Sequence, residues 1–397
     1  MSEVAGAVRR SPMGPAVHTG AFYLALFLAS GVQVPFWPIW LRDWGLTASE
    51  VGVYTALGVA VRVIAGLAIP ALADRLDRRV FTIVVCAALS VVLYLAHLGI
   101  VQKSTLLLAT LAVGSTTAGI NPIAEALGIA ASRFWGFRYA PVRAMGSIGF
   151  LAANLIAGAL MARYGSGVAL WWVVVCMAAV GALAIGHPGA RRVRGHAPPA
   201  LREIGRVVAD PTFAVFMAAV ASLQSSHAVI YALGSLHWQA LGIGEPEIGA
   251  LWAASVGGEI IFLMGFGTAL VQRVGPIGAL GIAGGAGVLR WSVMMADPTG
   301  LLLWPTQALH ALTFAACHLG TMAFISRAVP DRYHAAAQGA TTAMAVGAVT
   351  ALATLLASAV YPTLGGATYG ISLALSALGL AFTVALARRW NGRELAV

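Results

Sequence analysis

The segment SEVGVYTALGVAVR, residues 49–62, recurs later in the chain as PEIGALWAASVGGE, residues 246–259. The two segments align without a gap, 197 residues apart, and Arg62 ends the first where Glu259 ends the second. A charged side chain inside a membrane span costs at least ~2.5–3.5 kcal/mol, so such residues face a protein interior or a water-filled path. A repeat that places charges inside apolar segments predicts a transporter.

The repeat extends upstream of these two segments. Residues 41–52, LRDWGLTASEVG, parallel residues 238–249, WQALGIGEPEIG, at the same offset. Two parallel halves are therefore expected, each built around one copy of the repeat.

The composition is that of a membrane protein. Apolar residues make up 59% of the chain and charged residues 10%, with a mean hydropathy of +0.85, whereas soluble domains carry ~25% charged residues. At ~20 apolar residues per span, the sequence predicts an all-α membrane protein with twelve transmembrane helices. They are expected near residues 17–41, 51–72, 80–100, 104–131, 143–162, 168–187, 211–237, 247–271, 276–296, 300–327, 335–361 and 367–388.

Only one connection between these spans is both long and polar. It contains HPGARRVRGHAPPALREIGR, residues 187–206, and predicts an N-terminal six-helix half at 1–187, a cytoplasmic linker at 188–210 and a C-terminal six-helix half at 211–397. The other loops are too short to hold a soluble catalytic or nucleotide-binding domain, and no G-x-x-x-x-G-K-[ST] phosphate loop is present. The sequence therefore argues against an enzyme or an ATP-driven pump.

The net charge of +10 reports membrane topology. Most of the 24 lysines and arginines are expected at the end of the bundle that holds both termini, and only Arg42, Lys103 and Arg163 are expected at the opposite end. This positive-inside pattern predicts cytoplasmic termini in a multi-pass protein of a bacterial inner membrane, and it argues against nucleic acid as a partner. The N-terminal apolar run is as long as a span, so we expect an uncleaved first helix.

The segment ADRLDRR, residues 73–79, follows the second span and resembles the loop G-x-x-x-D-R-x-G-R-R of the major facilitator superfamily. Asp77 stands where that pattern has its second glycine. The resemblance implies two parallel six-helix halves around a central cavity and assigns Asp74, Arg75 and Arg78 to a conformational loop.

Several longer stretches resemble the phenylpropionate permease family, which is related to the lactose permeases. They are FWPIWLRDWGLTASEVG (36–52), PIAEAL (122–127), VRAMGSIGF (142–150), QSSHAVIYALGSLHWQALG (224–242), GEIIF (258–262), GVLRW (287–291) and QALHALTFAACHL (307–319). The resemblance implies a proton-coupled carrier of an aromatic acid or similar small solute.

The same likeness implies roles for individual residues. Glu125 and Arg143 match a substrate-binding carboxylate–arginine pair of lactose permeases. Three further residues match part of their proton-coupling cluster, namely Glu259, Arg290 and His310. Thr313 stands where those permeases carry a carboxylate, so their proton relay is not reproduced in full.

The buried charges support this assignment on their own. Burial favours the protonated form of a carboxylate and a nearby arginine favours its ionised form. Glu259 is therefore predicted to carry the proton, with Arg290 as the partner that sets its proton affinity. A permanent interhelical ion pair is the alternative.

The acid–arginine pairing leaves one cation over. Glu125 and Arg143 lie on consecutive spans and are expected to meet, although Arg143 is also compatible with a position at the cytoplasmic end. Arg62 is then unpaired and predicts an anionic substrate, because a carboxylate accepts two hydrogen bonds from a guanidinium. A pair between Arg62 and one of the two acids is the alternative.

Aromatic and amide side chains at helical spacing complete the predicted substrate site. Rings with a few placed polar groups suit a small aromatic ligand, although aromatic residues at span ends also act as membrane anchors. The predicted substrate-binding residues are Arg62, Glu125, Arg143, Gln33, Trp37, Asn121, Gln224, His227, Tyr231, Trp252 and His318. The histidines lie on different spans, and neither a metal nor another cofactor is expected.

The sequence as a whole predicts a monomeric secondary transporter that binds a small-molecule substrate and protons in a lipid bilayer. A proton-coupled importer of a phenylpropionate-like acid is the leading interpretation. Transport of a neutral sugar or nucleoside, and export in place of import, remain open. A polytopic membrane enzyme or sensor is the alternative from another class, and the short loops disfavour it.

Overall fold

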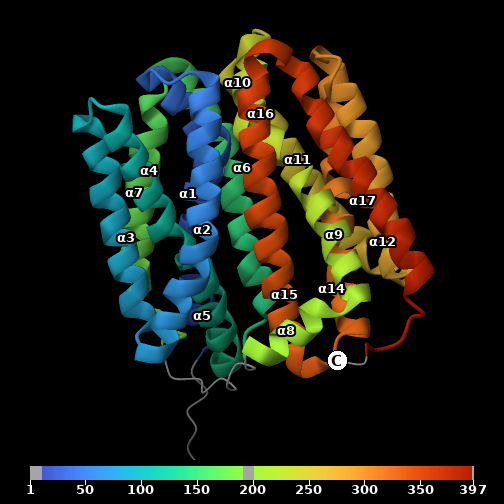
Figure 1. The fold of residues 1–397 in the computed structure, drawn as a ribbon. Helices are drawn as coiled ribbons and strands as arrows, with labels where there is room; N and C mark the ends of the chain where they lie inside the picture. The colour runs from blue at the N-terminus through green and yellow to red at the C-terminus, as the bar shows by residue number, and fades with distance from the viewer. Residues whose placement is uncertain (1–10, 191–200, 396–397) are drawn as a thin grey trace, which may run out of the picture.

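The computed structural model describes residues 11–190 and 201–395, and every regular element in these ranges is a helix (Figure 1). The helices before the linker are α1 (Met13–Trp44), α2 (Ala48–Leu76), α3 (Arg79–Ala96), α4 (Lys103–Ala118), α5 (Ile120–Trp135), α6 (Tyr139–Tyr164) and α7 (Gly167–Ala184). We call them the N-terminal helices.

The helices that follow form the second group, the C-terminal helices. They are α8 (Leu201–Ala209), α9 (Pro211–Ser225), α10 (Ser235–Ala240), α11 (Glu245–Gly265), α12 (Gly267–Met294), α13 (Leu303–Ala308), α14 (Cys317–Ala328), α15 (His334–Thr342), α16 (Thr350–Leu364) and α17 (Tyr369–Arg389). Short 3₁₀ or π segments join them: η1 (His97–Gly99) in the first group, and η2 (Ile230–Gly234), η3 (Gly300–Leu302), η4 (Ala311–Ala316), η5 (Asp331–Tyr333), η6 (Ala343–Val349) and η7 (Gly365–Thr368) in the second.

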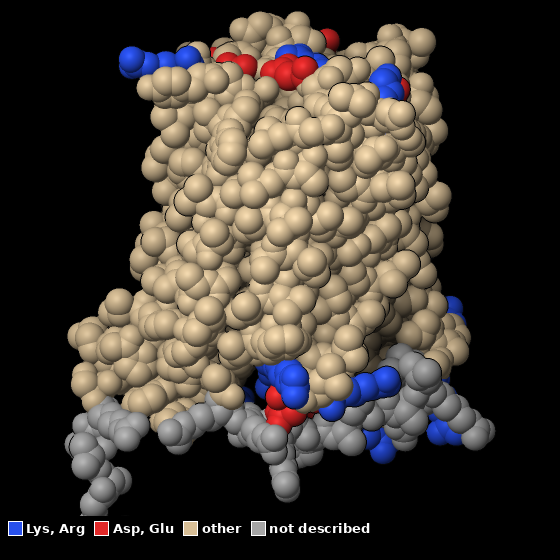
Figure 2. Space-filling model, turned by 90° about the vertical axis from the view of Figure 1, so that its left-hand side faces the viewer, with Lys and Arg blue, Asp and Glu red and all other residues tan. Residues whose placement is uncertain are grey.

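Within the described residues, eleven helical runs are long and apolar enough to cross a membrane. The last run, Ala336–Arg389, is 54 residues long, more than twice the ~20 residues that one span needs. A turn at Gly365, with φ 52°, divides it into α16 and α17. The prediction of an all-α membrane protein with about a dozen spans is confirmed. Figure 2 shows the resulting surface, an uncharged belt between two charged ends.

Local sequence signals set the helix boundaries. Thr47 and Glu50 form a capping box that starts α2, with reciprocal side-chain to backbone hydrogen bonds. Asp210 accepts from two backbone N–H groups at the start of α9, and Pro211 occupies its first turn. The fourth predicted span, 104–131, is divided at Gly119 into α4 and α5, just before the Asn121-Pro122 pair. The eighth predicted span reaches 271, whereas α11 ends at Gly265 because Phe266 leaves helical geometry.

The two groups of helices each pack mainly within themselves. Among the N-terminal helices, α1 packs against α6 and α7, and α3 packs against α4 and α7. Among the C-terminal helices, α17 packs against α9 and α12, and α14 packs against α12. The division into halves at 188–210 stays a prediction, and residues 191–200 of the predicted linker lie outside the described residues.

The groups touch each other through two helix pairs, α2 with α16 and α6 with α11. The closest contacts lie at the end of the molecule opposite the linker, where Ser49 Oγ donates to the backbone oxygen of Ser358 at 2.5 Å. At the linker end, the main partners of α5 are N-terminal helices and those of α14 are C-terminal segments. The described structure is therefore closed at the opposite end and separated at the linker end.

Candidate transport site

Glu259, His310 and Arg290 come from three elements of the C-terminal group and lie next to one another. Glu259 is on α11, Arg290 is on α12, and His310 is the residue between α13 and η4 that starts the π segment. His310 Nε2 is 3.7 Å from Oε2 of Glu259, and His310 Nδ1 is 3.2 Å from a terminal nitrogen of Arg290. His310 thus lies between the carboxylate and the guanidinium.

The arginine decides which nitrogen of His310 carries the proton. A guanidinium group only donates hydrogen bonds, so Nδ1 of His310 accepts from Arg290 and Nε2 carries the ring proton. The protonated Nε2 is the nitrogen on the side of Glu259. His310 is therefore neutral in this arrangement and presents a donor to the carboxylate.

Arg290 is held entirely by neutral acceptors. Its side chain is buried, with 1% exposed, and within the described residues no carboxylate lies within 4.0 Å of it. Besides His310, it donates to Thr313 Oγ1 at 3.2 Å and to Gln307 Oε1 at 3.0 Å. The direct pair with Glu259 that the sequence suggested is absent from this conformation.

His227 extends the same network across the C-terminal helices. Its Nδ1 is 3.1 Å from the backbone oxygen of Gln224, so this nitrogen donates. Its Nε2 lies 3.0 Å from the Thr313 hydroxyl, and in a neutral ring this nitrogen accepts from that hydroxyl. The His227 ring also meets the His310 ring edge-on, with centroids 5.2 Å apart.

Aromatic side chains border this polar network. Tyr231 stacks on Trp252 and on His227, with ring centroids 5.9 Å and 5.7 Å apart. The Trp252 indole donates to Ser235 Oγ at 3.0 Å, which fixes its orientation. Trp238 of α10 is buried and packs against Trp252. Of the predicted substrate-site residues, His227, Tyr231 and Trp252 are thus brought together beside Glu259's cluster.

Arg62 belongs to a separate cluster among the N-terminal helices. Its side chain is exposed and packs its Cγ against Gly114 of α4. Its charge also acts on Tyr94, which is fully buried and accepts a hydrogen bond from Gln33 Nε2 at 2.9 Å. Within the described residues, Arg62 makes no ion pair and no hydrogen bond.

Trp37 packs against the Tyr94 side chain of this cluster. Its ring meets Tyr94 edge-on at 5.2 Å and stacks on Trp40 at 4.5 Å. Trp37 is 7% exposed, so it shapes the position of Tyr94 more than it offers free surface to a solute.

Glu125 and Arg143 meet near the linker end of the N-terminal helices, as the sequence suggested. Arg143 Nε donates to Glu125 Oε1 at 2.5 Å, and Tyr139 donates a short hydrogen bond to the other carboxylate oxygen. The guanidinium also lies over Phe27, 4.3 Å from the ring centroid. Both side chains remain partly exposed, 39% for Glu125 and 30% for Arg143, so the pair is accessible.

The side chains of three predicted residues make no hydrogen bond, ion pair or ring contact with these clusters among the described residues. Asn121 and His318 are exposed and form no hydrogen bond there. Gln224 contributes through its backbone oxygen only.

Two residues of the site escaped the sequence analysis. Gln307 precedes His310 by three residues and Tyr139 precedes Arg143 by four, so each shares a helix face with a residue that was singled out. That spacing was the available signal. The hydrogen bonds across helices that give both residues their place are not encoded in it.

The loop between α2 and α3 was also singled out from the sequence. Arg79 Nε donates to Asp74 Oδ1 at 2.6 Å, and Asp77 ends α2 with φ 53°, the left-handed conformation that glycine favours. This explains why the superfamily pattern has glycine there. Arg75 is exposed.

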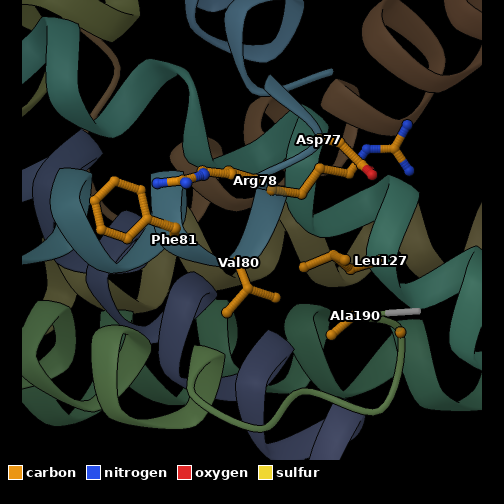
Figure 3. A pocket seen from close by; sticks show the side chains of 8 residues that line it. Asp77, Arg78, Val80, Phe81, Leu127 and Ala190 are labelled. Carbon is orange, nitrogen blue, oxygen red and sulfur yellow. The ribbon is translucent and has the colours of Figure 1, made fainter. Parts of the chain in front are cut away.

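A cleft lies between this loop and the beginning of the predicted linker (Figure 3). Arg78 extends over the ring of Phe81, 5.8 Å from its centroid. Val80, Leu127 and Ala190 line the cleft. It lies at the linker end of the molecule and belongs to neither central cluster.

Apolar helices in two groups, with charged clusters inside each group, define a membrane transport protein. The chain matches the model of the MFS_1 like family over residues 17–369, and it belongs to that family of major facilitator transporters. It is 27% identical over 314 residues to the probable 3-phenylpropionic acid transporter of Escherichia coli (strain K12), covering 77% of this chain and 80% of that protein. It is 22% identical to the uncharacterized transporter YwbF of Bacillus subtilis (strain 168), covering 80% and 79%.

Solved structures agree with this assignment of the fold. A mutant of the nucleoside transporter NupG superposes with a TM-score of 0.80 at 15% identity, over 95% of this chain and 100% of that one. A bacterial homologue of the iron transporter ferroportin, in an inward-facing state, gives a TM-score of 0.75 at 14% identity, over 95% and 99%. The protein is thus a multi-pass secondary transporter, and the resemblance to phenylpropionate permeases found in its sequence is confirmed.

Proposed function

We propose that this transporter couples an inward flow of protons to the import of a small aromatic acid. The observation that carries the proposal is an excess of unpaired positive charge. Arg62 and Arg290 have no carboxylate within ion-pair distance among the described residues, and Glu259, the acid of the Arg290 cluster, has His310 as its neighbour at 3.7 Å. A carboxylate substrate supplies the missing negative charge.

In this proposal, each group of helices binds a different part of the substrate. Arg62 binds the substrate carboxylate from the N-terminal helices. On the other side, the half-buried Tyr231 offers ring surface, backed by the buried Trp252, and such a surface suits an aromatic solute. The likeness to a probable 3-phenylpropionic acid transporter supports this choice of substrate class.

Glu259 carries the coupled proton in this proposal. Its side chain is 19% exposed, so water reaches it while His310 stays buried. Alternating access exposes Glu259 first to one aqueous face and then to the other. Glu259 takes up a proton on one side and releases it on the other. The described conformation, closed opposite the linker, corresponds to the inward-facing state if the linker is cytoplasmic, and the protein then lies in a bacterial inner membrane.

Reconstitution in proteoliposomes tests this function. Labelled 3-phenylpropionate should accumulate against its gradient when an inward proton gradient is imposed, and a protonophore should abolish the accumulation. Accumulation of a nucleoside or neutral sugar in place of every acid would select the alternative substrate class, which the fold also accommodates. Failure to move any acid, sugar or nucleoside would contradict the proposal.

A further inference from the structure

Gln307 occupies a junction between the helices of the proton-coupling cluster. It is buried, with 1% exposed. Its Oε1 accepts from Arg290 of α12 at 3.0 Å and from Ser255 Oγ of α11 at 3.1 Å. Ser255 lies one helical turn before Glu259, and Gln307 lies one turn before His310. One amide oxygen therefore ties the arginine's helix to the helix that carries the acid.

The resulting arrangement keeps two opposite charges apart although they share a neighbour. Arg290 and Glu259 approach the two nitrogens of one imidazole, at 3.2 Å and 3.7 Å. An arginine–carboxylate pair is stronger than hydrogen bonds to neutral acceptors. Several acceptors together hold the guanidinium in place: His310 and Thr313 accept from one terminal nitrogen, and Gln307 accepts from the other.

We propose that Gln307 is a positioning residue that holds Arg290 away from Glu259 and so leaves the carboxylate free to bind a proton. A direct pair with Arg290 would keep Glu259 ionised at neutral pH, and the coupled proton would have no carrier. This inference rests on the proposed function, because it concerns the proton step of the same site.

Among the described residues, no cation other than Arg290 lies close enough to Glu259 to keep its carboxylate ionised. The titratable groups that face Glu259 or Arg290 are His310, His227, Tyr231 and Tyr369, and they come from the helices packed around the pair. The hydrogen bond from Arg290 requires an unprotonated Nδ1 and so places His310 in its neutral form. The distance between Arg290 and Glu259 is therefore the variable that Gln307 controls.

Two substitutions of nearly unchanged size give opposite predictions. Gln307→Met removes the acceptor and lets Arg290 move toward Glu259, so the pH of half-maximal uptake should fall. Gln307→Glu places a carboxylate next to Arg290 and leaves Glu259 without a cation. The pH of half-maximal uptake should therefore rise. Each shift should be at least about one pH unit and at most about three, the size expected for two unit charges at contact distance with an effective dielectric constant of ~20.

The measurement is the initial rate of 3-phenylpropionate uptake between pH 5.5 and 9 in proteoliposomes. Thr321→Val is the matched control, because Thr321 is a buried polar residue on the same span whose hydrogen bonds go to Cys317 of its own helix. It should leave the profile unchanged. If Gln307→Met does not fold, the upward shift of Gln307→Glu decides the question alone.

Unchanged profiles, or shifts of both variants in the same direction, would overturn the positioning role while leaving the proposed function intact. A wild-type protein that shows no proton-driven uptake would instead count against the proposed function, before any variant is compared.

Discussion

At the scale of single residues, the arginines of the candidate site differ in whether a carboxylate lies in contact with them. Arg143 has a carboxylate in contact, whereas Arg290 is surrounded by neutral acceptors and Arg62 has no partner among the described residues. Because a buried cation without a counter-charge is costly, we propose that Arg290 marks a place where a negative charge has to arrive during the transport cycle, and that the exposed Arg62 is free to bind one.

Replacing Glu259 by glutamine separates proton coupling from solute movement. Glu259→Gln should abolish accumulation driven by a proton gradient and keep most of the exchange of labelled for unlabelled acid, because the amide mimics a permanently protonated carboxyl group. Glu247→Gln, an exposed change on the same helix, is the control and should keep both activities. Uphill uptake by Glu259→Gln would show that another group carries the proton.

Replacing Arg62 tests the substrate's charge. Arg62→Gln should weaken binding of 3-phenylpropionate about 10- to 100-fold, since a charge-assisted hydrogen bond contributes ~1.5–3 kcal/mol. The affinity for the neutral amide of the same acid should change much less. Arg42→Gln, which alters an arginine paired with Asp43 at the opposite end, should affect neither. Equal losses for acid and amide would contradict a carboxylate clamp.

At the scale of helices, the two repeat copies also supply the contact that closes one end of the molecule. Gly52 of α2 and Gly249 of α11 are equivalent in the repeat. A Cβ at Gly52 would lie 1.8 Å from Ser358 Oγ, and one at Gly249 would lie 2.2 Å from the backbone oxygen of Asn154. Each copy therefore brings its glycine against a helix of the other group.

Gly249→Ala should hinder closure of this end. A backbone oxygen cannot rotate away as a side chain does, so the two helices must separate and the equilibrium shifts toward the conformation open opposite the linker. The expected result is loss of most transport in a folded protein. Gly257→Ala on the same helix meets only a side chain at 3.9 Å and should transport normally. Equal activity of the two variants would remove Gly249 from the closing contact.

The segment after α7 is anchored by His187, which lies beyond the end of that span. His187 is buried against Phe22, and its burial, with a smaller contribution from His18, lowers its pKa to about 4. The folded protein therefore binds fewer protons here than the unfolded chain, whose histidines titrate near ~6.5. Stability is unaffected above that pH and falls as the pH drops from about 6.5 toward 4.

His187→Phe should flatten this pH dependence, because a phenyl ring needs no proton at any pH. Thermal unfolding in detergent at pH 7 and pH 5 measures the effect. The wild type should lose about 2 kcal/mol more than the variant over this interval. An identical loss in both proteins would assign the acid sensitivity to another group.

At the scale of the whole molecule, the charge distribution predicts orientation. Basic residues gather at the linker end, and few lie at the other end (Figure 2). A reporter that is active only in the cytoplasm should therefore work when it is fused after Arg389. A reporter that is active only in the periplasm should work when it is inserted near Lys103. The reverse pattern would turn the described conformation into an outward-facing one and reverse the expected direction of transport.

Much of the fold was predictable because it follows from local rules. Span number, helical class and the two-fold repeat depend on hydrophobic length and on residue order, and both are written along the chain. The pairing of Glu125 with Arg143 was predictable for a similar reason, since one short loop joins their spans. The route from Arg290 through His310 to Glu259 was not, because it depends on the rotation of three separate helices.

The amino-acid sequence by itself determined that this chain spans a membrane many times, that it repeats, and that it carries a few charges where lipid would not tolerate them. The tertiary structure alone decided which of these charges touch. It placed His310 between Arg290 and Glu259, assigned Gln307 as an acceptor for the arginine and left Arg62 exposed. The physical reason is range: hydrophobicity acts residue by residue, whereas hydrogen bonds and ion pairs act over a few ångströms between helices that are far apart in the chain.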